Sequence, residues 1–265
     1  MIINPYIFGG FDPDAQAFIT AANITNNTQR TAINQLVLDL KAYNIWSKMK
    51  AIYPFVGGTA STHKFNLKDP RDLDVAFRLV FNGGWTHSST GALPNGTNGY
   101  ADTKLNASSN LGQFSTSMSY YSRTINDGPY TDAGAQQASN LSQRIVLNFK
   151  YSGVGYYDQN DTGTGRLSVN MSSINSNGLF LMSRTANNIQ KAFRNGSQIG
   201  STNNNTISTL LPTSFIWLGA YNGSIPTYTN RECAFATIGD GFTDTDATNL
   251  YNTVQTFQTS LSRQV

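Results

Sequence analysis

The chain has 265 residues, a size that suits one large all-β domain or two small domains. Charged residues make up only 12% of it, about half of the usual share, and the net charge is +3. The 18 lysines and arginines are scattered, which excludes the clustered basic stripe of a nucleic-acid-binding domain. Asn and Thr, each commoner than the 23 glycines, fill the deficit in charge. Such a composition is typical of β-rich extracellular and virion proteins.

The single cysteine, Cys233, excludes an internal disulfide, and the apolar alternation around it predicts a buried thiol. The sequence shows no apolar run of 18 residues and no basic-then-apolar leader at Met1. We therefore expect no membrane insertion and no Sec-type export. The protein then stays in the cell that makes it or leaves by lysis, assembly or another route.

The N-terminal part is predicted to be an arm followed by short helices. Residues 1–10 read as an extended apolar arm, which either docks on a neighbour through Ile2–Phe8 or adds an edge strand to its own sheet. Asp12 and Pro13 form an N-cap and a first helical residue, and they open a short helix with one apolar face.

A second helix is predicted from near Thr28 to Asn44, which can end it in the left-handed conformation. Its apolar stripe consists of Ile33, Leu36, Val37, Leu40 and Tyr43. A further turn is expected through Trp46 and Met49, up to Pro54.

Beyond Gly57 and Gly58 the hydrophobic period changes to two, which predicts strands. The strongest alternation runs over 73–82, and Asn195-Gly196 is the best hairpin signal. Further strands are expected over 117–124, 143–151, 165–171, 178–184, 189–194, 214–220 and 231–238. Trp46 and Trp217 follow apolar patterns and are predicted to lie in the core.

The C-terminal part turns helical again. Thr243 is the expected N-cap, and Asp246 completes a capping box three residues later. The apolar face of this helix is formed by Ala247, Leu250, Tyr251, Val254, Phe257 and Leu261. We expect an arm and helical segment (1–58) packed on one sandwich with its C-terminal helix (59–265), in a single cooperative unit.

Several segments resemble laminin-G-like, concanavalin A-like domains in the same order. These are Gly99–Thr103, Ser119–Thr124, the hairpin Lys191–Ser201, the strand Ser214–Ala220 and the terminal Gly239–Tyr251. The resemblance covers roughly 73–261. It implies a mainly β fold, a jelly-roll sandwich of two antiparallel sheets, with the short N-terminal helices and the C-terminal helix added to it.

A narrower resemblance is to virion and tail-fibre proteins of tailed bacteriophages. It rests on Trp46–Ala60, on His63–Pro70 and on the ending Gln255–Val265. The resemblance implies a virion location, other virion proteins as partners and a homo-oligomer more than it implies any activity.

Sandwiches of this kind include both enzymes and binding proteins, and the presence or absence of catalytic residues distinguishes the two. Retaining glucanases of the laminarinase type carry two glutamates around an aspartate, whereas this chain has a single glutamate, Glu232. Paired aspartates could replace the glutamates, and the candidates are Asp69, Asp72 and Asp74 or the pair Asp158 and Asp161. Asp72 and Asp74 could share a strand face, but a solvated strand edge or a cap is the favoured interpretation. Only two histidines occur, His63 and His87, and each is expected to form hydrogen bonds in a loop rather than belong to a zinc site or a triad.

The remaining candidates are for binding. Aromatic side chains at a sandwich rim, with amide partners, suit a sugar, and the candidates are Trp85, Tyr156, Tyr157, Tyr221 and Asn222. For each of these residues taken singly, a cap on the end of the core is the favoured interpretation. The resemblance to laminin-G-like domains also implies one Ca²⁺, for which the loop residues Asp158, Asn160 and Asp161, or Asp127 with Asp132, supply oxygen ligands. The same residues are good turn formers.

Two classes of function therefore remain. We expect a non-enzymatic bacteriophage virion structural protein, a head or tail decoration or fibre, that binds cell-surface polysaccharide. The alternatives are a glycan-active lyase or hydrolase of the same fold, or a bacterial carbohydrate-binding module.

Overall fold

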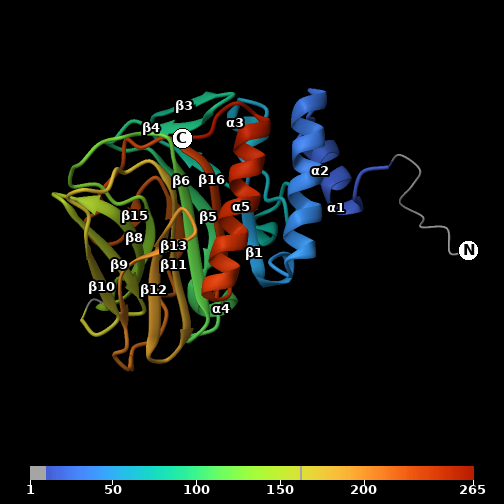
Figure 1. Cartoon of the computed structure of the whole chain (residues 1–265). Coiled ribbons are helices and arrows are strands. Elements are labelled where there is room, and N and C mark those ends of the chain that lie inside the picture. The colour runs from blue at the N-terminus through green and yellow to red at the C-terminus, as the bar shows by residue number, and fades with distance from the viewer. Residues whose placement is uncertain (1–9, 162) are drawn as a thin grey trace, which may run out of the picture.

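The computed structural model describes residues 10–161 and 163–265, and it consists of three layers. A layer of helices covers one sheet, and that sheet packs face to face on a second sheet (Figure 1). Each sheet has eight strands within these residues, paired antiparallel except for the short strand β15. The expected mainly β sandwich is confirmed. The proposed roles of the arm Ile2–Phe8 fall outside the described residues.

The first sheet lies between the helices and the second sheet. Its order is β13-β12-β11-β6-β16-β4-β3, and β1 also pairs with β16. Its strands are β1 (Met49–Tyr53), β3 (Trp85–Ser88), β4 (Gly91–Pro94), β6 (Thr116–Ser122), β11 (Gly178–Ala186), β12 (Ile189–Arg194), β13 (Ser197–Asn203) and β16 (Cys233–Gly239).

The second sheet has one face turned away from the helices. Its order is β10-β9-β8-β7-β14-β5-β2, and β15 pairs with β7. Its strands are β2 (Val80–Asn82), β5 (Tyr100–Asn106), β7 (Ala133–Gln137), β8 (Asn140–Tyr151), β9 (Val154–Gln159), β10 (Arg166–Asn170), β14 (Phe215–Leu218) and β15 (Tyr221–Asn222).

The main core fills the space between the two sheets. Because strand side chains alternate between faces, Ile145, Leu147 and Phe149 of β8 point inward and are fully buried. Phe149 stacks on Phe180 of the first sheet with ring centroids 4.2 Å apart. Cys233 is also fully buried, as predicted.

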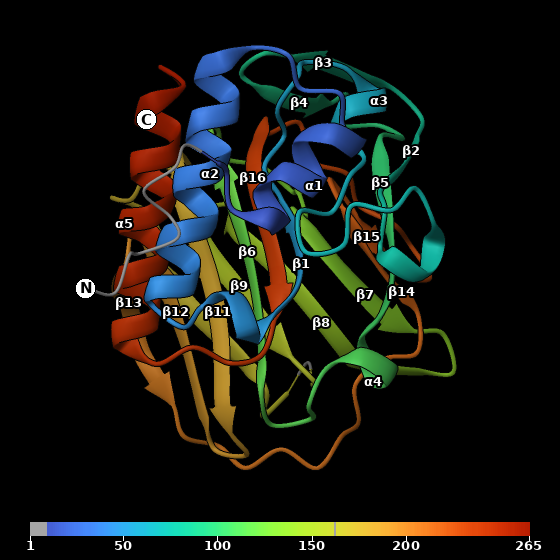
Figure 2. The same ribbon diagram turned by 90° about the vertical axis from the view of Figure 1, so that its right-hand side faces the viewer.

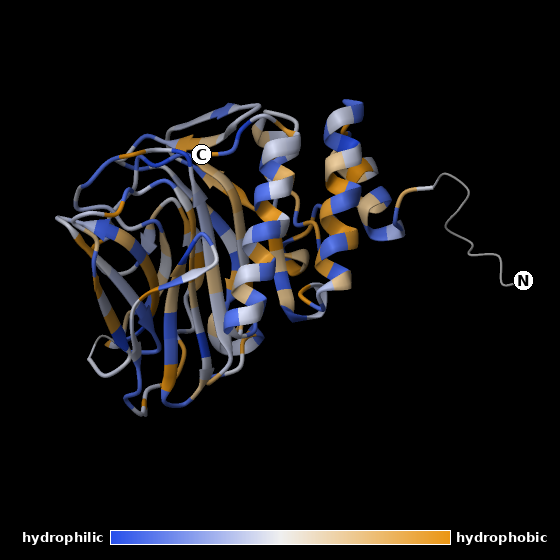
Figure 3. Ribbon diagram, viewed as in Figure 1, coloured by the Kyte–Doolittle hydropathy of each residue, from blue (hydrophilic) through white to orange (hydrophobic). Residues whose placement is uncertain are grey.

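The helical layer forms a second core on the outer face of the first sheet. Helices α1 (Pro13–Ala21), α2 (Asn27–Ala42) and α5 (Asp244–Ser260) lie there side by side (Figure 2). Apolar residues recur along α2 and α5 (Figure 3), and those of α2 bury against α5 and the sheet. Each fully buried Leu, Val or Phe contributes roughly 1.5–3 kcal/mol, so the three helices depend on this contact for their stability.

The predicted helix ends are confirmed. The Asp12 side chain accepts a hydrogen bond from the Asp14 amide at the start of α1. Thr243 and Asp246 form a capping box at the start of α5. Asn44 follows α2 with φ of +58°, the left-handed conformation that an asparagine tolerates.

Two local predictions were wrong. The alternating segment 73–82 forms a strand only at its end, β2; before it come the 3₁₀ turn η3 (Asp74–Ala76) and Phe77 with φ of +59°. Ion pairs from Arg78 to Asp72 and Asp74 favour this turn, and Val75 stays exposed. The segment after the 3₁₀ turn η2 (Trp46–Lys48) is strand β1, because its backbone pairs with β16.

Several strands were not anticipated as such, and one of them matters for the site. Tyr156 and Tyr157 were placed in a Gly-rich loop, but they belong to β9, between β8 and β10. Trp217 was expected in the core, yet it lies half-buried and stacks on Tyr100 at 3.8 Å. Trp46 is likewise only partly buried, against the helical core. The Asn195-Gly196 hairpin joins β12 and β13 as predicted, with φ of +50° and +77°.

Short helices α3 (Ala60–His63) and α4 (Ala107–Asn110) complete the described chain. Within that part, no helix is both long enough and apolar enough to cross a membrane.

Candidate functional site

The candidate site is the open face of the second sheet over β8, β9 and β10. On β8, Arg144, Val146 and Asn148 alternate with the inward residues and so point to this face. The register places Asp158 of β9 between Val146 of β8 and Arg166 of β10. The side chains therefore form cross-strand rows on one surface.

Two arginines hold one carboxylate in the first of these rows. Arg166 donates from Nε to Asp158 Oδ1 at 2.8 Å and from Nη2 to Oδ2 at 3.0 Å. Arg144 Nη2 lies 2.5 Å from Asp158 Oδ2 on the other side. Burial raises the pKa of the Asp158 carboxyl to about 7, and the charge and hydrogen bond of Arg144 oppose that shift.

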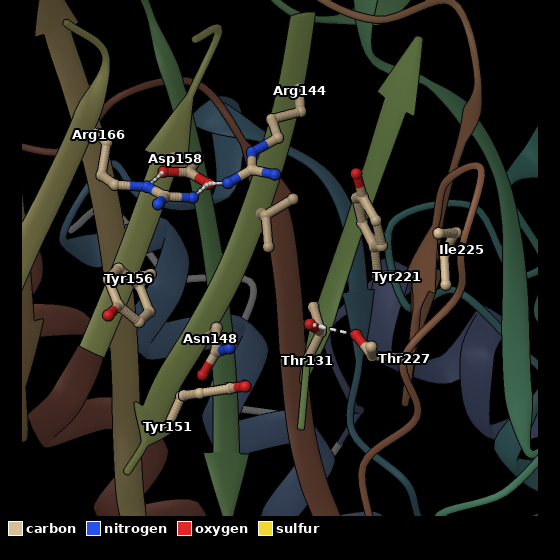
Figure 4. Close-up of a pocket in the computed structure, with 11 residues that line it drawn as sticks. Thr131, Arg144, Asn148, Tyr151, Tyr156, Asp158, Arg166, Tyr221, Ile225 and Thr227 are labelled. Atoms are coloured by element: carbon tan, nitrogen blue, oxygen red, sulfur yellow. Dashed lines mark hydrogen bonds and ion pairs between the residues drawn. The ribbon is translucent and has the colours of Figure 1, made fainter. Parts of the chain in front are cut away.

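Tyrosines surround this ion cluster. Tyr156 lies next to Arg166, whose guanidinium carbon is 4.9 Å from the ring centroid. Tyr151 meets Tyr156 edge to face at 6.3 Å. Tyr221 comes from β15, and its hydroxyl points toward Arg144 (Figure 4). Burial raises the pKa of the Tyr221 hydroxyl, and Arg144 opposes that shift.

These groups enclose a pocket of about 330 Å³. Its remaining walls are apolar at Val146 and Ile225 and polar at Thr131, Thr227 and Asn148 (Figure 4). The Thr131 and Thr227 hydroxyls bond to each other at 2.7 Å. The pocket combines aromatic rings, an amide, hydroxyls and guanidinium groups, a set that suits a small polar ligand with many hydroxyls.

The structure brings some of the predicted sugar-binding residues together and separates others. Tyr156 and Tyr221 line the pocket, from β9 and β15. Tyr157 is fully buried between the sheets, because it lies one residue out of phase with Tyr156. Its prediction as a rim aromatic is therefore wrong. Asn222 follows Tyr221 but uses its side-chain amide to donate to the Phe215 carbonyl.

Trp85 lies elsewhere. It belongs to β3 of the first sheet, donates from Nε1 to the Asn82 carbonyl and packs against Phe81 at 5.3 Å. It also contacts the main core from the side. Trp85 thus has the alternative role, a cap on the core, and does not line the pocket.

The predicted calcium ligands do not fit a cation. Both Asp158 oxygens are engaged by arginines. Asn160 donates to the Gln113 carbonyl, and Asp161 caps its own loop at Gly163 and Thr164. The described residues contain no group of three or more His, Cys, Asp or Glu side chains arranged to hold a metal.

The second candidate pair of calcium ligands, Asp127 and Asp132, does not form a shared site either. Asp132 is fully buried in an ion pair with Arg231, and it also accepts from Thr229. Asp127 accepts a hydrogen bond from the Gly153 amide at an exposed turn. A cation would therefore have to displace an arginine, which holds its carboxylate through two hydrogen bonds.

The residues weighed for catalysis are held in other contacts. Glu232 accepts from Arg123 and from the Thr90 hydroxyl. Asp72 is exposed and pairs with Lys64 and Arg78. Neither Glu232 nor Asp72 lines the pocket, whereas Asp158, which was also weighed for catalysis, does line it and is paired there with Arg144 and Arg166.

The two histidines form a pair that the sequence did not predict. Their Nδ1 atoms are 2.9 Å apart, and the Gly58 amide donates to His63 Nε2 at 3.2 Å. His63 therefore carries its proton on Nδ1 and donates it to His87. Burial lowers the pKa of His63 to about 3, with a further contribution from His87, and burial also lowers that of His87.

The sequence analysis missed eight pocket residues: Arg144, Asn148, Tyr151, Arg166, Thr131, Val146, Ile225 and Thr227. The first two could have been found, because they alternate with apolar residues in the predicted strand 143–151 and so had to share its outer face. Arg166 also lay in a predicted strand, but the pairing of β10 with β9 was not predicted.

The comparisons with known proteins concern the fold. No protein-family model and no curated protein sequence matches the chain. A mutant of Trypanosoma rangeli sialidase displaying trans-sialidase activity is similar in structure, with a TM-score of 0.55 and 8% identity over 84% of this chain and 39% of that one.

Two further solved structures are similar to this chain over part of their length. One, a mutant of HCR D/C VPI 5995, has a TM-score of 0.50 at 13% identity and covers 80% of this chain and 53% of that one. The receptor binding domain of botulinum neurotoxin C/D mosaic serotype has a TM-score of 0.49 at 10% identity, over 78% and 51%. The chain thus spans about two fifths to one half of these proteins. The likeness to the sialidase and to the HCR D/C mutant shows the fold alone.

Proposed function

We propose that the chain is a non-enzymatic glycan-binding sandwich, and that the pocket over β8, β9, β10 and β15 is its binding site. The observation that carries the proposal is the composition of the pocket. Tyrosines, an asparagine amide, threonine hydroxyls and arginines line a pocket of about 330 Å³ on one sheet face. Aromatic faces pack on the apolar face of a sugar ring, and the polar groups bind its hydroxyls.

The other face of the sandwich is not available for such a ligand. Helices α2 and α5 cover the outer face of the first sheet and bury its apolar side chains. The name of the T. rangeli relative places a sugar-processing enzyme among proteins of similar fold. That likeness supports the proposal only as far as the fold, since the chain covers 39% of the sialidase.

The proposal includes a biological setting. The chain is a structural component of a tailed-bacteriophage virion, a head or tail decoration or fibre, present as a homo-oligomer beside other virion proteins. The resemblance of 46–60, 63–70 and 255–265 to such proteins supports this setting, as does the amide- and hydroxyl-rich composition. Cell-surface polysaccharide is then the ligand that such a particle meets.

Tyrosine substitutions test the site. Tyr156→Ala and Tyr221→Ala should each weaken binding to any glycan that an array of bacterial surface polysaccharides identifies, by about tenfold per lost ring contact. Tyr43→Ala is the matched control, because Tyr43 is exposed at the end of α2 on the helical side.

The same experiment separates a binder from an enzyme. A glycan bound by the wild-type chain should be recovered intact, without new reducing ends or unsaturated sugars. Release of such products, lost on changing Asp158 or Tyr221, would favour the lyase or hydrolase. Glycan binding that all three tyrosine variants retain would place the site elsewhere.

A further inference from the structure

The charge that a ligand meets in the pocket is positive. The side chains of Arg144 and Arg166 are 18% and 32% exposed, whereas that of Asp158 is 1% exposed. The carboxylate thus lies beneath the two guanidinium groups. The other acid near it, Asp161, has both oxygens engaged by Gly163 and Thr164 of its own loop.

Polar atoms of the pocket also lack partners. Among residues 10–161 and 163–265, Arg144 Nε has no hydrogen-bond partner, and neither has Oδ1 of Asn148, a residue only 7% exposed. Buried polar atoms are nearly always paired, and each unpaired one costs about 1–3 kcal/mol. Unsatisfied groups on the wall of a pocket indicate a polar ligand that supplies the missing hydrogen bonds.

The ion cluster keeps the guanidinium groups in place. Arg166 donates to Asp158 from Nε and Nη2, and Arg144 pairs with the same carboxylate through Nη2. Arg144 also forms a hydrogen bond with the Tyr221 hydroxyl. The donors that these contacts leave on the two guanidinium planes, Arg144 Nε among them, remain for a ligand. Asp158 therefore acts as a positioning residue, and its own charge compensates only one of the two arginines.

On these grounds we infer that the pocket takes an acidic sugar, with its carboxylate on the outer edges of Arg144 and Arg166 and its ring against Tyr156 or Tyr221. Guanidinium groups match a carboxylate with two parallel hydrogen bonds, which a neutral sugar cannot offer. This inference rests on the proposed glycan-binding function and specifies the ligand class for the same site.

Matched pairs of probes test it on the full wild-type chain. Oligogalacturonate is compared with its methyl ester, and sialyllactose with lactose, by calorimetry at low and high salt. The acidic member of at least one pair should bind about tenfold more tightly, and added salt should reduce the difference. Equal binding of both members in each pair would overturn the inference while leaving glycan binding intact. Absence of binding to every probe, together with a negative polysaccharide array, would overturn both proposals.

Variants then locate the charge. Arg166→Gln should remove most of the preference for the acidic probe, so that the acidic and the neutral member of a pair bind this variant with affinities within about twofold of each other. Arg71→Gln is the matched control, because it removes an arginine that also pairs with an aspartate but lies outside the pocket. An acidic preference that survives both Arg166→Gln and Arg144→Gln would overturn the assignment of these residues. Because the wild-type comparison needs no substitution, a variant that fails to fold does not affect the first result.

Discussion

Single buried side chains account for several features that the sequence did not disclose. Arg263 is almost completely buried, and it donates to the carbonyls of Pro54, Phe55 and Ala234 and to Gln258. Within the described part of the chain it forms no ion pair with a carboxylate. Burial lowers the pKa of Arg263 to about 9. The His63–His87 pair lies close enough that the Arg263 charge helps to lower the pKa of His63. A buried arginine and two histidines with lowered pKa values therefore lie near one another in the fold.

The histidine pair predicts a pH dependence of stability. Because the folded pKa of His63, about 3, is below its usual value of 6.5, protons bind the unfolded chain more tightly. The stabilisation is present above pH 6.5 and is lost as pH falls toward 3. At pH 5 the loss amounts to about 2 kcal/mol of unfolding free energy relative to pH 7.

Urea unfolding at several pH values measures this effect. The variant His63→Gln should show a shallower decline between pH 7 and pH 5 than the wild-type chain. Equal slopes for the two proteins would contradict the assignment. Titration of the His63 ring by NMR in the wild-type chain, where it should stay neutral at pH 5, is an independent check.

At the scale of elements, the N-terminal segment is part of the sandwich through its backbone as well as its helices. Strand β1 pairs with β16, with Tyr53 opposite Ala236, and α2 packs on α5. The expected boundary at residue 58 thus separates β1 from the sheet to which it belongs. The described part of the chain favours one cooperative unit over two.

Removal of residues 1–58 should therefore destabilise the rest. The truncated chain would expose the apolar side chains beneath α1 and α2 and leave part of β16 unpaired. We expect a lower midpoint of thermal unfolding and binding of a hydrophobic dye. A truncated chain that melts with the full-length protein and binds no dye would contradict this prediction.

The sequence predicts elements better than it predicts which faces meet. Helix ends were predictable because capping depends on neighbouring residues, as at Thr243 and Asp246. The strand predicted over 73–82 failed because ion pairs around Arg78 stabilise a turn where alternation alone favours a strand. Tyr156 was among the residues predicted to bind a sugar, and it lines the pocket. Its partner Arg166 depended on strand order, which is set by contacts distant in sequence.

For the whole molecule, we predict weak binding per site and strong binding by many copies. One shallow pocket without deep enclosure suits a dissociation constant of about a millimolar. Display of many linked copies raises the apparent affinity by roughly 10² to 10⁴ without any new contact. Glycan arrays probed with the monomer and with multivalent particles measure the difference. Tight binding by the isolated monomer would contradict the prediction.

The helical layer makes the two broad sides of the sandwich different, because it covers only one of them. Since α2 and α5 occupy one broad side of the sandwich, the opposite sheet face is where the pocket opens. A chain attached to a support through its helical side would therefore point its pocket outward, whereas attachment through the second sheet would block the pocket. Valency can then rise only by placing more chains side by side in the same orientation, because a single chain offers this pocket in one direction.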